Sequence, residues 1–155
     1  MRILWLASYP KSGNTWLRAF LANYLKNAPE PEDINALPTF ALGDMRIEPY
    51  LRASGKPASA LSRGEIARLR PAVHKALAAA GPGLVPVKTH SVIATIDGIP
   101  TITPEVTFGA LYVVRNPLDV AVSFHHHYAV TLDQAVRAVC FKGLEIPPKD
   151  GHVVQ

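Results

Sequence analysis

The sequence of 155 residues has little cysteine, little charge and no long apolar run, and each shortage excludes a class of protein. Cys140 is the single cysteine, so an intramolecular disulfide and a cysteine-rich metal site are both excluded, and a reducing compartment is favoured. We expect Cys140 to be a small buried residue on a helix. No stretch is long enough to span a bilayer, and the apolar run at residues 3–7 is too short for a secretory signal. A cytoplasmic protein without membrane attachment is therefore expected.

Hydrophobic residues are plentiful, at 48% of the chain, whereas charged residues make up only 18%. This balance is typical of a folded domain with a real core and argues against a disordered chain. The length fits one domain. The formal net charge of +4 suits an anionic ligand, although it is weak support by itself.

Short apolar runs predict three strands, at residues 2–8, 84–87 and 108–114. After the first strand the apolar period changes to that of a helix. The side chains that form this helical face are Trp16, Leu17, Phe20, Leu21, Tyr24 and Leu25.

Capping signals predict the starts of three more helices. Ser62 with Glu65 forms a capping box, and we expect Pro71 to kink or split the helix that follows. Asn116 caps a second helix with a proline at its first position, and Thr131 caps a third. Residues 28–60, rich in proline, are expected to be mostly loop with short helical pieces, and no element is predicted for residues 145–155.

Strands that alternate with helices predict an α/β fold, a three-layer α/β/α sandwich around a parallel sheet. Ligands of such sheets bind outside the carboxyl ends of the strands. Three polar groups fall there: Lys11-Ser12-Gly13, Lys88-Thr89-His90, and Arg115. The strands themselves give no reason for these charges, so we expect an anion site at this edge.

The loop that joins the first strand to the first helix has the composition of an anion cradle. Free backbone N–H groups and the helix dipole favour an anion there, and Gly13 allows close approach. Ser12, Asn14 and Thr15 add donors, and Lys11 adds a positive charge. The P-loop of nucleotide triphosphatases places its lysine after a second glycine, whereas here the lysine comes first. A magnesium-dependent kinase is therefore disfavoured.

Three motifs together resemble the cytosolic-type sulfotransferase family. Residues 9–16, YPKSGNTW, resemble its 5′-phosphosulfate signature, with Asn14 where many members have threonine. Residues 111–124, LYVVRNPLDVAVSF, look like its 3′-phosphate segment, and residues 88–90 match its K-T-H triplet. The resemblance implies a sulfotransferase fold similar to that of P-loop nucleotide hydrolases. It also implies the donor 3′-phosphoadenosine-5′-phosphosulfate and sulfuryl transfer to a hydroxyl or amine of a small molecule, without a metal or nucleic acid.

The resemblance also implies residue roles. His90 would be the general base, Lys11 would stabilise the leaving phosphate, and Lys88 would contact the sulfuryl group. Trp16 would lie beside the adenine, although simple core packing is an equal alternative. The donor-binding set would be Lys11, Ser12, Gly13, Asn14, Thr15, Trp16, Arg115 and Ser123.

The resemblance covers residues 1 to about 130, and the family's later R-K-G segment does not occur before Gln155. We therefore expect one domain, the N-terminal donor-binding part of the fold, in which residues 28–83 shape the acceptor site. A non-catalytic nucleotide-binding or regulatory module is the alternative, and a homo-oligomer stays open. Consecutive residues point about 100° apart on a helix, so residues 125–127, HHH, are not expected to bind a metal.

Overall fold

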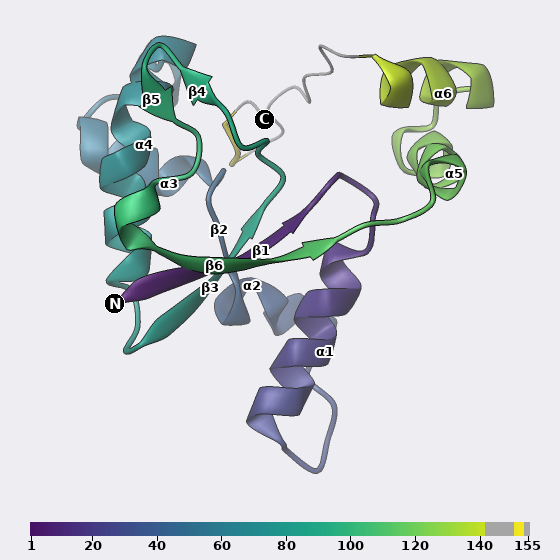
Figure 1. Ribbon diagram of the computed structural model, residues 1–155, viewed down its shortest axis with the longest axis horizontal. Helices are drawn as coiled ribbons and strands as arrows, with labels where there is room; N and C mark the ends of the chain where they lie inside the picture. The colour runs from purple at the N-terminus through teal and green to yellow at the C-terminus, as the bar shows by residue number, and fades with distance from the viewer. Residues whose placement is uncertain (142–150, 154–155) are drawn as a thin grey trace.

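The computed structural model describes residues 1–141 and 151–153 and has a parallel sheet at its centre (Figure 1). The sheet has four strands in the order β2-β3-β1-β6. The chain enters through β1 (Arg2–Ser8), which pairs in parallel with β3 (Leu84–Thr89) and with β6 (Thr107–Val113). The short strand β2 (Leu42–Gly43) extends the β3 edge. The predicted α/β class with a parallel sheet is confirmed, and helices flank the sheet on both sides.

The helices alternate with the strands along the chain. In Figure 1 α1 and α2 lie below the sheet, α3 and α4 lie above it, and α5 and α6 lie beyond the end of β6. The bounds are α1 (Asn14–Lys26), α2 (Leu37–Phe40), α3 (Ile47–Ser54), α4 (Arg63–Ala78), α5 (Pro117–Tyr128) and α6 (Leu132–Cys140), with short 3-10 turns at Ile34–Ala36, Ala58–Ala60 and Pro104–Val106.

The hydrophobic core lies between β1, β3 and α4. Trp5 and Val87, from adjacent positions on the two strands, are almost fully buried, and Val73 of α4 packs into the same cluster. His74 is also fully buried, where its ring meets the edge of the Trp5 ring at 4.9 Å. The apolar runs predicted buried strands, and β1 and β3 are largely removed from solvent here.

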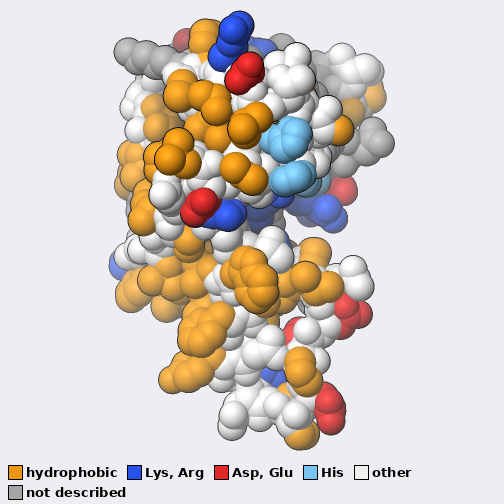
Figure 2. Space-filling model, turned by 90° about the vertical axis from the view of Figure 1, so that its right-hand side faces the viewer, with side chains coloured by type: hydrophobic (Ala, Val, Ile, Leu, Met, Phe, Trp, Pro, Cys, Tyr) orange, Lys and Arg blue, Asp and Glu red, His pale blue; other side chains and the backbone are white. Residues whose placement is uncertain are grey.

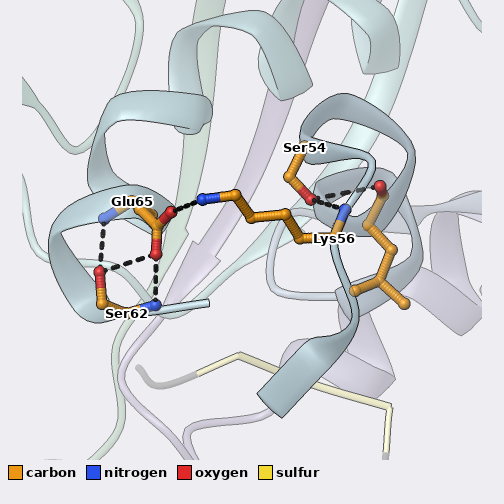
Figure 3. A network of polar contacts seen from close by, with 5 residues as sticks. Ser54, Lys56, Ser62 and Glu65 are labelled. Atoms are coloured by element: carbon orange, nitrogen blue, oxygen red, sulfur yellow. Dashed lines mark hydrogen bonds and ion pairs between the residues drawn. The ribbon is translucent and has the colours of Figure 1, made fainter. Parts of the chain in front are cut away.

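The capping box at the start of α4 is formed as predicted, and Figure 3 shows it from close by. The Ser62 hydroxyl accepts from the Glu65 N–H, and the Glu65 carboxylate accepts from the Ser62 N–H. Lys56 approaches the same carboxylate, and this contact together with Ser62 lowers the pKa of Glu65 to about 2. The helix runs through Pro71 without splitting, so the expectation of a split was wrong.

The segment between α1 and α4 consists of short pieces, as expected, but it also adds β2, which the sequence did not reveal because two residues carry no period. A small hairpin of β4 (Thr95–Ile96) and β5 (Ile99–Pro100) was missed as well. Its turn is Asp97-Gly98, with both residues at positive φ, the geometry that Asp-Gly favours in two-residue hairpins.

The apolar face predicted for α1 lies largely on the surface, although its period is that of a core-facing helix. Trp16, Phe20 and Tyr24 are exposed by 83%, 64% and 70%. Side chains of β6, including Phe108 and Tyr112, are exposed as well. Figure 2 shows hydrophobic side chains over the upper and lower parts of this side of the molecule, with Lys and Arg at the waist between them. The homo-oligomer stays a prediction.

One expectation about the end of the chain was wrong. Cys140 lies on α6 as expected, but it is exposed rather than buried. Residues 151–153, for which no element was predicted, pair with the turn before α3. There the Val153 N–H donates to the Met45 carbonyl, and the Ile47 N–H donates to the Gly151 carbonyl. These contacts place His152 beside the carboxyl ends of the strands.

Candidate functional site

The junction between β1 and α1 is a tight loop held by unusual backbone angles. Lys11 has φ 67° and Gly13 has φ 110°, both in the left-handed region. A non-glycine residue rarely adopts this region, and such strain persists where the surrounding structure holds it. The Ser12 N–H donates to the Tyr9 carbonyl at 3.2 Å, which closes the turn.

The amino end of α1 is open to a ligand. Gly13 caps the helix without a side-chain hydrogen bond, and no acidic residue occupies the first turn. The first N–H groups of the helix therefore keep their capacity for an anion, which the helix dipole also favours. Asn14 fixes the helix to the sheet, because its buried side-chain amide donates to the Leu6 carbonyl at 2.7 Å.

A cavity of about 420 Å³ opens at the carboxyl ends of β1, β3 and β6 and brings the predicted site together. All but one of the predicted site residues line it, although they come from four separate stretches of the sequence. The predicted residues that line it are Lys11, Gly13, Asn14, Thr15, Trp16, Lys88, His90, Arg115 and Ser123. Ser12 is buried behind the loop and lines a neighbouring hollow instead.

Arg115 joins the two phosphate motifs. It follows β6, and its Nη1 donates to the Lys11 carbonyl at 3.2 Å, across 104 positions of sequence. The guanidinium at the end of one strand therefore touches the loop that follows the neighbouring strand. Ser123 faces the same cavity from α5, which Asn116 caps by accepting from the Leu118 N–H as predicted.

His90 has its ring orientation and tautomer set by β1. Nδ1 lies 2.7 Å from the Ser8 carbonyl, to which it must donate because a carbonyl only accepts. Nε2 is then the nitrogen that can take a proton. The pKa of His90 is lowered to about 4, first by burial and then by the charges of Lys88 and Arg18, while the Ser8 carbonyl opposes the shift. The imidazole is therefore neutral at physiological pH, the form that a general base requires.

Lys88, two positions before His90, lines the same cavity from β3. Burial lowers its pKa, the charge of Arg18 lowers it further, and Asp44 opposes both. Asp44 also holds this strand end: its carboxylate accepts from the Thr89 hydroxyl at 2.8 Å and is buried. Thr89 is therefore a structural member of the triplet.

A second cavity of about 590 Å³ lies on the other side of Lys88 and His90, which line both cavities together with His152. Most of its wall comes from residues 38–52 and 76–80. These positions fall within residues 28–83, the segment expected to shape the acceptor site. His90 therefore borders both cavities.

Trp16 does not pack in the core, so that alternative was wrong, and its place beside the adenine stays a prediction. It stands exposed at the edge of a shallow hollow that it shares with Phe20 and Val113. The hollow and the first cavity have Gly13, Trp16 and Arg115 in common. A flat ring held against Trp16 would therefore lie beside the arginine.

Four residues of the first cavity were missed by sequence reasoning: His127, Tyr128, His152 and Val153. The run of three histidines at residues 125–127 was a partial signal for His127. Nothing local points to His152, because only the pairing of residues 151–153 with the turn before α3 brings it there. Within residues 1–141 and 151–153 no group of three or more His, Cys, Asp or Glu is arranged to hold a metal.

A strand–loop–helix junction next to a half-buried lysine and a neutral histidine favours an anion at this edge of the α/β fold. The chain belongs to the sulfotransferase family: the family model described as a sulfotransferase domain matches residues 2–142. The family membership indicates sulfuryl transfer in general. A search of curated proteins gives no match. Among the helices described, none is both long and apolar enough to cross a membrane. The cytoplasmic location stays a prediction.

Proposed function

We propose that this protein transfers a sulfuryl group from 3′-phosphoadenosine-5′-phosphosulfate to a hydroxyl or amine of a small-molecule acceptor. The observation that carries the proposal is the single cavity that unites the cradle, Lys88 and His90, and Arg115 with Ser123. The hydrogen bond between Arg115 and the Lys11 carbonyl supports it, because it holds the two motifs that resemble phosphate-binding segments next to each other.

The two phosphate groups of the donor fit separate parts of this cavity. The first N–H groups of α1, with Lys11, suit the 5′-phosphosulfate, because they combine backbone donors and a positive charge. Arg115 and Ser123 suit the 3′-phosphate, since a guanidinium offers paired donors to a phosphate. The exposed face of Trp16 suits the adenine.

In the proposed reaction His90 Nε2 accepts the proton of the acceptor hydroxyl or amine. The bound donor supplies the sulfuryl group: a bond from the acceptor atom to sulfur forms while the bond from sulfur to the phosphate oxygen breaks, releasing adenosine 3′,5′-bisphosphate. Lys11 stabilises the charge that develops on that phosphate, and Lys88 contacts the sulfuryl oxygens. His90 then releases its proton to solvent.

The acceptor would reach His90 through the second cavity. His90 lines both cavities, so an acceptor held in the second can present its hydroxyl to the imidazole while a donor fills the first. Two separate cavities support this step, because an acceptor in the second would not have to displace a donor in the first.

Titration calorimetry with adenosine 3′,5′-bisphosphate, compared with ATP plus magnesium, tests the donor site. We expect the bisphosphate to bind in preference. Lys11→Ala and Arg115→Ala should each weaken binding by roughly tenfold or more, as expected for a lost charge-assisted contact. Arg2→Ala, at the opposite end of β1, is the matched control and should bind like the wild type.

Unchanged affinity in both Lys11→Ala and Arg115→Ala would refute the proposed donor site. Turnover of labelled donor then separates the two functions that the sequence left open. Sulfuryl transfer to a panel of phenols, alcohols and amines supports the enzyme. Bisphosphate binding without transfer to any acceptor supports the non-catalytic module.

A further inference from the structure

Arg18 is a cation of the second cavity that has no acidic partner among residues 1–141 and 151–153. It lies on α1 and lines this cavity but not the first. One of its end nitrogens, Nη2, donates to the Thr15 hydroxyl at 3.3 Å, while its Nε is buried without a hydrogen-bond partner among the described residues. No carboxylate of residues 1–141 and 151–153 lies within ion-pair distance of it. A partly buried guanidinium in this state favours an anion beside it.

The surroundings of Arg18 add positive charge. Burial lowers the pKa of Arg18 itself. Its charge also contributes to the lowered pKa values of Lys88 and His90, after burial in each case, so it lies close to both. Arg46 and Arg52 line the same cavity nearer its rim. Like charges gathered around a cavity raise its affinity for anions.

The two acidic residues of the cavity do not balance these cations. Asp44 is buried, and its carboxylate accepts hydrogen bonds from the hydroxyls of Thr89 at 2.8 Å and Ser91 at 3.4 Å. Burial raises its pKa to about 6, so part of its charge is absent near neutral pH. Glu48 is half exposed and lies 3.7 Å from Arg46. Neither forms an ion pair with Arg18.

We infer that the acceptor carries an oxyanion, a carboxylate, sulfate or phosphate group, which Arg18 binds in the second cavity while the hydroxyl or amine of the same molecule meets His90. The inference rests on the proposed function, whose acceptor class it narrows to small anionic hydroxy or amino compounds. Arg18 is a specificity-determining residue. The bound oxyanion also offsets the charge of Arg18 next to His90, which makes the imidazole a stronger base once the acceptor is in place.

Matched acceptor pairs test the inference in the transfer assay. The pairs are para-hydroxybenzoate with para-hydroxybenzamide, glycolate with glycolamide, and glycerol phosphate with glycerol, so a carboxylate is distinguished from a phosphate. We expect kcat/KM to favour the anionic member of at least one pair by roughly tenfold or more. In Arg18→Gln this preference should vanish through a higher KM for the anionic member, with the KM of the neutral member unchanged.

Two further variants keep the test decisive. Arg18→Lys retains the charge and should keep part of the preference. Lys26→Gln, at the far end of α1, removes a cation outside both cavities and should keep all of it. The thermal midpoint of each variant shows whether α1 is intact. A preference that is absent from all pairs in the wild type, or that persists in Arg18→Gln, overturns the inference.

One outcome of the transfer assay would assign Arg18 to the donor site, and an NMR titration tests its effect on His90. If Arg18→Gln raises the KM of the donor equally with both members of a pair, Arg18 belongs to the donor site and the inference is overturned. With the bisphosphate bound, adding the anionic member of the pair that shows the preference should raise the pKa of His90 by NMR in the wild type but not in Arg18→Gln, and equal responses would contradict the inference. Calorimetry with the bisphosphate alone reports the proposed function separately, so its failure is distinct from loss of the anion preference.

Discussion

The sheet is buried on the β3 side of β1 and exposed to solvent on the β6 side. Toward β3, Val85 and Val87 are buried beneath α4, with 7% and 0% of their surface exposed. Toward β6, Phe108 and Tyr112 remain exposed by 59% and 66%. The carboxyl ends follow the same division, since His90 is held inside by the Ser8 carbonyl whereas Arg115 is exposed.

This difference in exposure suits the two sides of the proposed site to different roles. Removal from water shifts the proton equilibria of Lys88 and His90, and such shifts prepare groups for proton transfer and charge stabilisation. An exposed guanidinium keeps its charge and can exchange water for a phosphate. The covered side is therefore suited to chemistry and the open side to donor binding.

The largest expected effect follows from removing the base on the covered side. We expect His90→Ala to lower kcat by roughly a hundredfold to ten-thousandfold, the usual contribution of a positioned general base. Binding of adenosine 3′,5′-bisphosphate should stay within about threefold of the wild type, because the phosphates contact other residues. Calorimetry and a turnover assay check the two halves of this prediction. Full activity in His90→Ala would contradict the proposed role.

The pH profile sharpens the same prediction. The pKa of His90 is about 4, so kcat/KM should not fall as the pH drops from 8 to 5, and should fall roughly tenfold per pH unit below about 4. This imidazole faces two positive groups, Lys88 and Arg18, and the fixed carbonyl of Ser8. Burial and these positive charges are why the acidic limb of the pH profile is expected at so low a pH. A limb near the ordinary value of 6.5 would show that the ring is solvated during turnover.

A matched pair of leucines tests the difference in covering itself. Leu6 of β1 and Leu111 of β6 are partners in the parallel register, yet Leu6 is fully buried and Leu111 is 41% exposed. Leu6→Ala should lower the free energy of unfolding by about 2–5 kcal/mol, and Leu111→Ala by under about 1 kcal/mol. Urea unfolding of both variants checks this prediction. Equal losses would mean that β6 is covered in solution, as a homo-oligomer would require.

Much of this arrangement was predictable from local patterns. The strand at residues 2–8, the capping box at Ser62, the Asn116 cap and the three polar groups at strand ends follow from period and capping chemistry. Parallel strands carry their carboxyl ends to one edge, so Lys11, His90 and Arg115 had to meet there.

The rest depended on tertiary contacts that no local pattern encodes. The face of α1 that contains Phe20 has the period of a core-facing helix, and only the extent of the sheet decides that it is exposed. His152 reaches both cavities because residues 151–153 pair with Arg46, a contact between distant segments. From the sequence Arg18 is an ordinary surface residue of a helix. Only the structure shows that its Nε is buried without a hydrogen-bond partner among the described residues.

The smallest expected effect concerns His74, which makes the covered side sensitive to acid. Burial, with the charge of Arg70, lowers its pKa from 6.5 to about 3. Between these values the unfolded chain binds a proton at His74 that the folded chain does not, so this contribution to stability is complete above about pH 6.5 and declines as the pH falls toward 3.

His90 acts in the same direction on the free energy of unfolding, whereas Asp44, with a raised pKa of about 6, opposes both histidines. The readout is therefore the slope of the unfolding free energy against pH in His74→Gln, whose side chain can still hydrogen-bond Thr103. We expect this slope between pH 4 and 6 to be smaller than that of the wild type by up to about 1.4 kcal/mol per pH unit. Equal slopes would mean that water reaches His74, and the contrast between the two sides of β1 would then be weaker than their side-chain exposures imply.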